Sequence, residues 1–227
     1  MDMEIKTPGF AVVGDIHGDF PELVWNITER YKITDTTFLI AGDCGIGFDN
    51  SLEDMYTRKL KLRLEKTGNH ILCIRGNHDN PEFFKEGNLI DLPYLKTLPD
   101  YTHLTWGDRK ILIIGGGVSV DREDRQEGKN WWPSERINQS LESLDGKEDI
   151  VVSHMAPLCI GPVLLREDWM PYDVWAADKT DREYLSTVLK ETRPTKWIFG
   201  HYHKSISGDY EDCLWRGLDI QEIYEIR

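Results

Sequence analysis

The amino-acid sequence predicts an α/β fold in which helices cover mixed β-sheets. Two observations support this prediction. Five short apolar runs, rich in β-branched residues and without polar alternation, each end in a polar turn, as strands buried on both faces do. Amphipathic segments of helical length separate the early runs, whereas strand-like runs follow one another near the C-terminus. This order is typical of mixed sheets with helical layers.

The five apolar runs end in a similar way. They comprise residues 10–13, 38–41, 71–75, 150–152 and 197–199, and the turns after them contain Gly14-Asp15, Gly42-Asp43, Gly76-Asn77, Ser153-His154 and Gly200-His201. Glycine at a strand exit lets the chain turn sharply. We therefore expect the polar residue of each turn to lie at the edge of a sheet.

The remaining elements follow from helical periodicity and from further apolar runs. Helices are predicted over 21–33, over 52–66, from an N-cap at Ser134 to Leu144, and from an N-cap at Asp181 through Leu189. Strands are predicted over 110–114, 213–218 and 221–226, the last two separated by a tight turn near Asp219. The sequence contains no repeat or linker, so we expect a single domain over residues 1–227.

Composition narrows the classes of function. The 227 residues carry a net charge of -13, from 27 basic and 40 acidic residues, which argues against binding long nucleic acids. A small phosphate ester remains compatible if divalent cations reverse the charge locally. The sequence has four cysteines without a CxxC pair, no signal-peptide pattern and no apolar run long enough to span a bilayer. We expect a cytoplasmic protein with no membrane partner.

The polar turns contain metal-binding residue types. Each motif has a plain alternative: Asp15-Ile16-His17 could be a polar turn, and His154 could be a structural histidine. Together, however, the motifs hold five of the seven histidines, at the end of the strands where α/β sheets bind ligands. Buried carboxylates and imidazoles in such a cluster would be costly without metal ions.

The order of these motifs, D-x-H, G-D, G-N-H-D, H and G-H-x-H, resembles the calcineurin-like metallophosphoesterase superfamily, including its bacterial and phage members. The resemblance extends from Asp15 to His203. It implies a four-layer αββα sandwich of two mixed β-sheets flanked by helices. It also implies that the chain is a metal-dependent phosphoric ester hydrolase.

The resemblance further implies a ligand set for two divalent metal ions. Asp15, His17 and His203 would bind one ion, Asn77, His154 and His201 the other, with Asp43 bridging them. Mixed imidazole and oxygen donors suit Mn²⁺, Fe, Zn²⁺ or Ni²⁺ better than Ca²⁺, and we expect Mn²⁺. No cysteine is among these ligands, which argues against a closed structural zinc site.

The implied mechanism is in-line attack on phosphorus by a hydroxide that bridges the two metals. Asp43 and Asn77 would take part as ligands. By resemblance, His78 faces the substrate and stabilises the transition state or protonates the leaving oxygen, a task that suits an imidazole. Asp79 either orients His78 or closes the turn.

One loop departs from the Ser/Thr protein phosphatase pattern G-D-x-x-D-R-G. Residues 42–48 read GDCGIGF, so the second Asp and the phosphate-clamping Arg are absent, which puts protein-phosphatase activity in doubt. Arg122, Arg125 and Trp131, in and after a glycine-rich strand exit, could bind substrate instead. Equally, these arginines could pair with acidic neighbours and Trp131 could pack in the core.

The leading hypothesis is a phosphoesterase acting on a small phosphomonoester or phosphodiester, for which a small nucleotide is one candidate. The alternatives are a nuclease acting on short nucleic-acid ends, a Ser/Thr-type protein phosphatase and a non-catalytic scaffold. The scaffold reading is disfavoured because every expected ligand and His78 are present.

Overall fold

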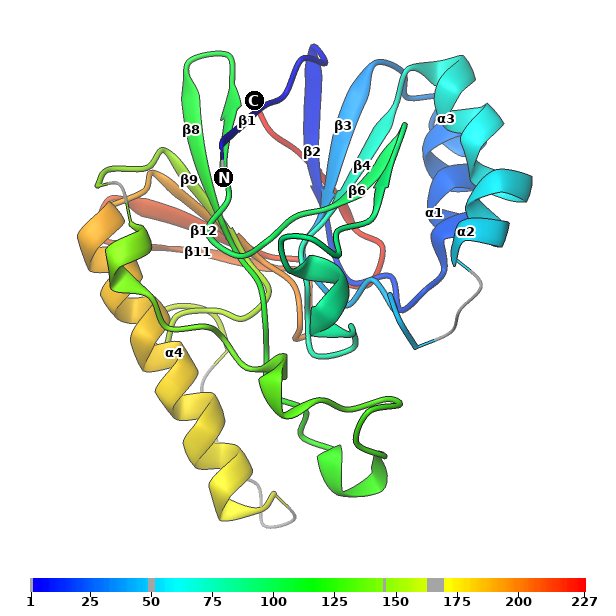
Figure 1. The fold of residues 1–227 in the computed structure, drawn as a ribbon. Helices are drawn as coiled ribbons and strands as arrows, with labels where there is room; N and C mark the ends of the chain where they lie inside the picture. Colours follow the sequence, from blue (N-terminus) through cyan, green and yellow to red (C-terminus); the bar gives the residue numbers. More distant parts are fainter. Residues whose placement is uncertain (1, 49–51, 145, 163–169) are drawn as a thin grey trace.

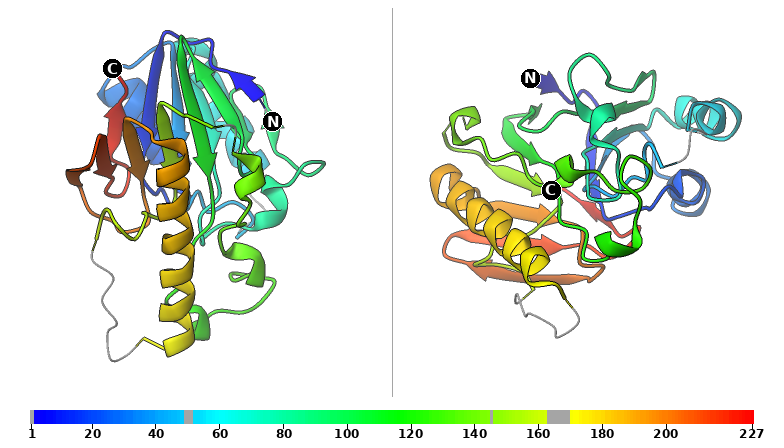
Figure 2. Two further views of the ribbon diagram at one scale, coloured as in Figure 1. Left: turned by 90° about the vertical axis from the view of Figure 1, so that its left-hand side faces the viewer. Right: turned by 60° about the horizontal axis from the view of Figure 1, so that its bottom comes forward.

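Two β-sheets pack face to face, and helices cover the outer face of each (Figure 1). The structure is a computed structural model, and it describes residues 2–48, 52–144, 146–162 and 170–227. The four layers, seen from two further sides in Figure 2, confirm the predicted α/β sandwich.

The first sheet has six strands in the order β13-β2-β3-β4-β6-β5. Their bounds are Gly9–Val13 (β2), Thr36–Ile40 (β3), His70–Cys73 (β4), Asp91–Leu92 (β5), Leu95–Thr97 (β6) and Ile223–Glu225 (β13). Strands β2, β3, β4 and β6 are parallel, and β5 and β13 are antiparallel edge strands. The sheet is therefore mixed, and the carboxyl ends of β2, β3 and β4 lie side by side.

The second sheet has seven strands in the order β1-β7-β8-β9-β10-β12-β11. They are Asp2–Glu4 (β1), His103–Trp106 (β7), Arg109–Ile114 (β8), Ile150–Ser153 (β9), Lys196–Phe199 (β10), Ile206–Tyr210 (β11) and Cys213–Gly217 (β12). The central strands β8, β9, β10 and β12 are parallel. Strands β12 and β13, which the sequence places on either side of a turn near Asp219, lie in different sheets.

The helical layers differ in length. Helices α1 (Phe20–Trp25), α2 (Leu52–Met55) and α3 (Lys61–Thr67), with π-helical turns at Asn26–Arg30 and Tyr56–Leu60, occupy the two segments predicted to be helical near the N-terminus. They lie on the outer face of the six-stranded sheet, and α4 (Tyr172–Thr192) lies on the outer face of the other (Figure 1). Short 3₁₀ turns occur at Pro81–Phe84, Arg122–Asp124, Pro133–Glu135 and Leu141–Ser143.

Three apolar clusters join the four layers. Strand residues such as Val12, Leu39 and Val152 point into the space between the sheets. Their neighbours along the strands, such as Val13 and Val151, point outward against the helices. Because side chains alternate along a strand, apolar residues at every position are needed to fill the layers on both faces. This explains the absence of polar alternation.

Two predicted helices differ from the structure. The prediction of a helix from Ser134 to Leu144 is wrong: the segment contains only two three-residue 3₁₀ turns. The Arg75 guanidinium donates to the carbonyl oxygens of Ser134, Glu135 and Arg136, groups that a helix would use internally. The prediction of an N-cap at Asp181 is also wrong, since Asp181 lies inside α4 and accepts hydrogen bonds from Arg136.

No helix among the described residues combines the length and the apolar character that crossing a bilayer requires. All four cysteines are free thiols, and three of them are buried. They therefore contribute to the packing of the fold rather than to covalent cross-links.

Candidate metal centre

The five strand-exit motifs meet at one end of the molecule. Three follow β2, β3 and β4 of one sheet, and two follow β9 and β10 of the other. Parallel pairing brings the carboxyl ends of neighbouring strands together, and face-to-face packing of the sheets brings the two sets into contact. Their side chains form two overlapping groups of donor atoms, each group lying within 4.8 Å, with Asp43 common to both.

The first group contains Asp15, His17, Asp43 and His203. The Nε2 atom of His203 lies 3.0 Å from Asp15 Oδ2 and 3.1 Å from His17 Nε2. Asp15 and Asp43 are buried, whereas the two imidazoles lie nearer the surface. Two imidazole nitrogens and a carboxylate oxygen thus converge on one point, as ligands of a metal ion do.

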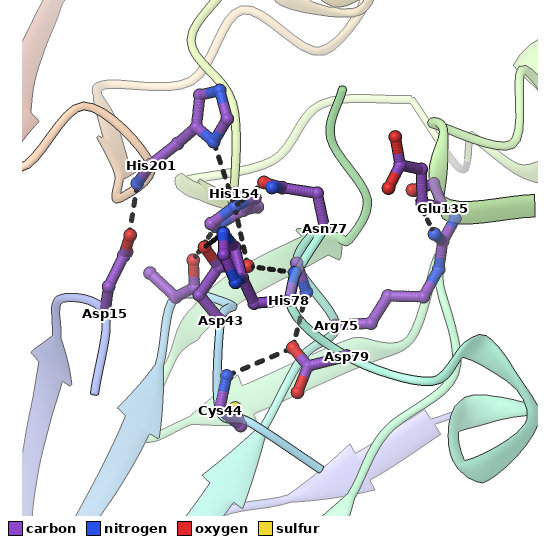
Figure 3. Close-up of polar contacts among 12 residues, drawn as sticks. Asp15, Asp43, Cys44, Arg75, Asn77, His78, Asp79, Glu135, His154 and His201 are labelled. Carbon is purple, nitrogen blue, oxygen red and sulfur yellow. Dashed lines mark hydrogen bonds and ion pairs between the residues drawn. The ribbon is translucent and has the colours of Figure 1, made fainter. Parts of the chain in front are cut away.

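The second group contains Asp43, His154 and His201, and Asn77 lies beside it (Figure 3). His154 Nε2 lies 3.3 Å from Asp43 Oδ1, 3.0 Å from Asn77 Oδ1 and 3.2 Å from His201 Nδ1. The other ring nitrogen of His154 is 2.8 Å from the carbonyl oxygen of Ala41, which fixes the ring orientation as outer partners of metal ligands do. All seven sequence-predicted ligand residues therefore lie in or beside the two groups.

The backbone is unusual at this cluster. His17, Asp43, His201 and His203 have positive φ angles of 46°, 50°, 65° and 49°, a left-handed conformation that is uncommon outside glycine. Such residues cost of order 1–3 kcal/mol each and cluster at functional sites. Glycine at position 76 allows the Asp43 carboxylate to approach the backbone of the next loop, because a Cβ on Gly76 would lie 2.1 Å from Asp43 Oδ1.

The protonation of the cluster fits a cation site. Burial opposes ionisation of Asp43, yet His154 outweighs it and holds the pKa of this carboxyl well below its usual range. Burial likewise disfavours a charged His154, but Asp43 raises the pKa of the imidazole to about 9. In the protein alone, a protonated His154 thus offsets the charge of the buried Asp43 carboxylate. A divalent ion would replace that proton, since ligands must be deprotonated to bind metal.

A chain of buried hydrogen bonds orients Asn77. Its Nδ2 atom donates to Ser119 Oγ at 3.3 Å, and Ser119 Oγ donates to Glu135 Oε2 at 2.6 Å. The backbone N–H of Ser119 donates to Glu135 Oε1 at 2.8 Å. A carboxylate only accepts, so the Ser119 hydroxyl accepts from Asn77, and Asn77 Oδ1 faces His154. Sequence reasoning missed Ser119 and Glu135, although Ser119 lies in the glycine-rich exit of β8.

His78 lies on the surface of the cluster and contacts Arg125. Its backbone N–H donates to Asp43 Oδ1 at 2.7 Å (Figure 3). A nitrogen of the Arg125 guanidinium, Nη2, lies 2.7 Å from His78 Nε2. Because a guanidinium only donates, His78 Nε2 is the acceptor and the ring is neutral in this arrangement. Burial, together with Arg125, lowers the pKa of His78.

Asp79 closes the turn rather than contacting the His78 ring. Its carboxylate accepts from the backbone N–H groups of Gly76, Cys44 and Ile46 at 2.8, 3.1 and 2.8 Å. These bonds tie the loop after β4 to the loop after β3. The ring of Phe48, at the end of the latter loop, stacks on the His78 ring with centroids 5.9 Å apart.

The three residues predicted to bind substrate lie in different surroundings. The side chain of Arg125 is largely enclosed beside His78 and also pairs with Asp121. Arg122 instead pairs with the exposed Asp173 of α4. Trp131 forms a backbone bridge with Glu127. Among the described residues that line the two cavities bordering the cluster, only Arg125 of the three is present.

The chain is similar to known proteins in its fold and in its sequence family. A candidate 5′-nucleotidase from Staphylococcus aureus has a similar fold, with a TM-score of 0.50 and 15% identity over 96% of this chain. This chain spans half the length of that protein. Phosphopantetheinyl hydrolase from Mycobacterium tuberculosis gives a TM-score of 0.49 with 12% identity, covering 98% of this chain and 96% of that one. Residues 9–205 match the model of the calcineurin-like phosphoesterases, and the chain belongs to this family.

Proposed function

We propose that this protein is a two-metal phosphoesterase that hydrolyses a small phosphomonoester or phosphodiester. The observation that supports this most directly is the pair of donor groups sharing Asp43. Asp15, His17 and His203 would hold one divalent ion, Asn77, His154 and His201 the other, and Asp43 both. Manganese is the proposed metal, because mixed imidazole and carboxylate donors suit it.

Bound ions would supply an activated water and neutralise charge on the phosphoryl oxygens. The protein's own groups would position the ester. Arg125 can donate to a phosphoryl oxygen from its place beside His78. Once the substrate displaces Arg125, His78 Nε2 would be free to take up a proton from solvent, and the imidazolium would stabilise charge near the leaving oxygen or protonate it.

Two variants test the proposal. Metal-free protein is loaded with Mn²⁺, and hydrolysis of p-nitrophenyl phosphate and bis-p-nitrophenyl phosphate is measured with the bound metal content. Asp43→Asn should lose metal and reduce turnover by at least about a hundredfold. Mutating a residue that only hydrogen-bonds a metal ligand can already cost about a hundredfold in activity, and a ligand should cost at least as much. His78→Ala should keep its metal and lose about 10²–10⁴-fold in turnover.

The matched control is Asp91→Asn, because Asp91 is an exposed edge-strand residue that pairs with Lys96. It should behave like the parent protein. Equal rates for the parent and Asp43→Asn would refute the two-metal mechanism. Loss of metal in His78→Ala would instead assign that residue a ligand role. Metal-loaded protein that hydrolyses neither ester would contradict the proposed activity.

A further inference from the structure

A cavity of about 440 Å³ adjoins the candidate metal centre. Asn77, His78 and His201 form the wall on the side of the centre, and Val118 and Val120 contribute apolar surface. Asp178 of α4 also lines the cavity. The volume lies in the range of pockets that hold small organic ligands. The organic part of a phosphoester bound at the centre would extend into it.

Asp178, on the wall of this cavity, has a carboxylate oxygen that makes no hydrogen bond in the described part of the chain. Its side chain is buried, with 7% of the residue exposed. Within the described ranges, its Oδ2 atom is fully enclosed and has no hydrogen-bond partner. Buried polar atoms are normally paired, and an unpaired carboxylate oxygen is especially costly. Because Oδ2 is closed to solvent in the free protein, a rotation of the Asp178 side chain would be needed to bring it to a donor in the adjoining cavity, and such a bond would remove the cost.

The charged neighbours of Asp178 on α4 are already bonded elsewhere. Arg182, one helical turn away, donates to carbonyl oxygens of Ala156, Pro157, Ile160 and Pro162. Asp181 accepts from Arg136 and Gln139. Lys179 pairs with Glu183. The fold thus satisfies these side chains, whereas Asp178, on the cavity wall, keeps one carboxylate oxygen unpaired among the described residues.

The chemistry of Asp178 indicates what kind of ligand would bind. A carboxylate accepts hydrogen bonds and cannot donate when ionised. Burial raises the pKa of Asp178 to about 6, so the group is mainly ionised at neutral pH. Its complement is an N–H or O–H donor carried on a body that also contacts the apolar side chains. A nucleobase and a sugar both meet this description.

We propose that Asp178 accepts a hydrogen bond from an N–H or O–H group on the organic part of the substrate. The enzyme would then prefer phosphate esters of a nucleoside or sugar to esters of an unsubstituted phenol. This inference rests on the proposed function, since it assumes that the phosphoryl group sits at the metal centre. Asp178 would be a specificity-determining residue, because a site built to hydrogen-bond a substrate discriminates against analogues without the donor.

The test measures discrimination rather than rate alone. The values of kcat/KM are determined for adenosine 5′-phosphate, ribose 5-phosphate and phenyl phosphate, each also as its methyl diester. Asp178→Ala should lower the ratio of either donor-bearing substrate to phenyl phosphate by at least about tenfold, as expected for a lost bond to a charged group. Glu183→Ala, which removes an exposed carboxylate from the same helix, should leave the ratio unchanged.

A binding measurement separates this inference from the proposed activity. Adenine and ribose are titrated calorimetrically into metal-free protein. At least one should bind the parent about tenfold more tightly than Asp178→Ala, and the one that does identifies an amine or a hydroxyl as the donor.

An unchanged discrimination ratio with unchanged affinities would overturn the role of Asp178. Parent protein that favours phenyl phosphate over both donor-bearing esters would overturn it as well. Failure of every ester to react would refute the proposed function alone, and the titrations would still decide the role of Asp178.

Discussion

Replacing Glu135 by Gln should reverse the hydrogen-bond chain that orients Asn77. The Ser119 backbone N–H, 2.8 Å from Glu135 Oε1, would hold the amide oxygen of the new side chain in that place. The amide nitrogen would then occupy the position of Oε2, 2.6 Å from Ser119 Oγ, and donate to it. The Ser119 hydroxyl hydrogen, no longer bonded to residue 135, would turn toward Asn77 and favour its amide oxygen.

The magnitude follows from what Asn77 would present to the metal centre. Its Oδ1 now lies 3.0 Å from His154 Nε2, among the donor atoms. A reversed amide would place an NH₂ group there, which cannot ligate a cation. Changes to partners of metal ligands cost roughly 10–100-fold in affinity, or about 1.4–2.7 kcal/mol. Gln has nearly the shape of Glu, so we expect little change in packing.

The assay is calorimetric titration of Mn²⁺ into metal-free protein. Glu135→Gln should weaken one of the two binding events by about tenfold or more and leave the other near its parent value. Ser119→Ala removes the hydroxyl without reversing it, so its effect should be smaller. Glu148→Gln is the matched control, since Glu148 is a buried carboxylate that pairs with His103. Parent-like binding by Glu135→Gln, or an equal loss in Ser119→Ala, would refute the reasoning.

Two further predictions concern stability. Burial raises the pKa of Asp178 from 3.8 to about 6, so its ionisation destabilises the fold. Below about pH 4, Asp178→Asn should therefore have the same free energy of unfolding as the parent. As the pH rises through 6, the variant should become more stable than the parent by about 2–3 kcal/mol, measured by urea unfolding. A difference in stability that does not depend on pH would contradict this. At Gly42 (φ +95°), a Cβ would lie 2.3 Å from His154 Nδ1. Gly42→Ala should lower the free energy of unfolding by more than about 2 kcal/mol in the same assay. The control is Gly107→Ala (φ +62°), where a Cβ meets open space and the loss should be much smaller. Similar losses of stability in the two variants would exclude the clash as the cause.

The residue patterns predicted mixed sheets covered by helices and the approximate place of the site, and the family resemblance predicted the four-layer sandwich. Strands such as β3 and β9 are apolar on both faces because each lies between another sheet and a helix. That burial leaves few positions for a polar residue except the strand exit. The order of exits along the chain therefore predicted the cluster, including Asp43, before any pairing of strands was known.

Contacts between distant segments could not be predicted in the same way. The segment from Ser134 to Leu144 has a helical pattern, but Arg75 captures its carbonyl oxygens from 59 residues or more away. Similarly, Arg122 and Arg125 are three residues apart and chemically identical. The geometry of the turn at Arg122–Asp124 sends one to Asp173 and the other to His78, and no local pattern distinguishes them.

The motifs that suggested metal chemistry also explain why their glycines and ligands occur together. Asp43 and His201 each lie just after a buried strand, and the backbone of both is in the left-handed region. The residues before them are glycines, because a Cβ would collide with the cluster. A Cβ at Gly42 would lie 2.3 Å from His154 Nδ1, and one at Gly200 would lie 2.2 Å from Asp15 Oδ1. The carboxylates of Asp15 and Asp43 lie close together among residues with costly backbone conformations. Such an arrangement lowers the stability of the protein when no ligand is bound. The strain is consistent with a centre built for a cation, which would offset the cost of burying Asp15 and Asp43.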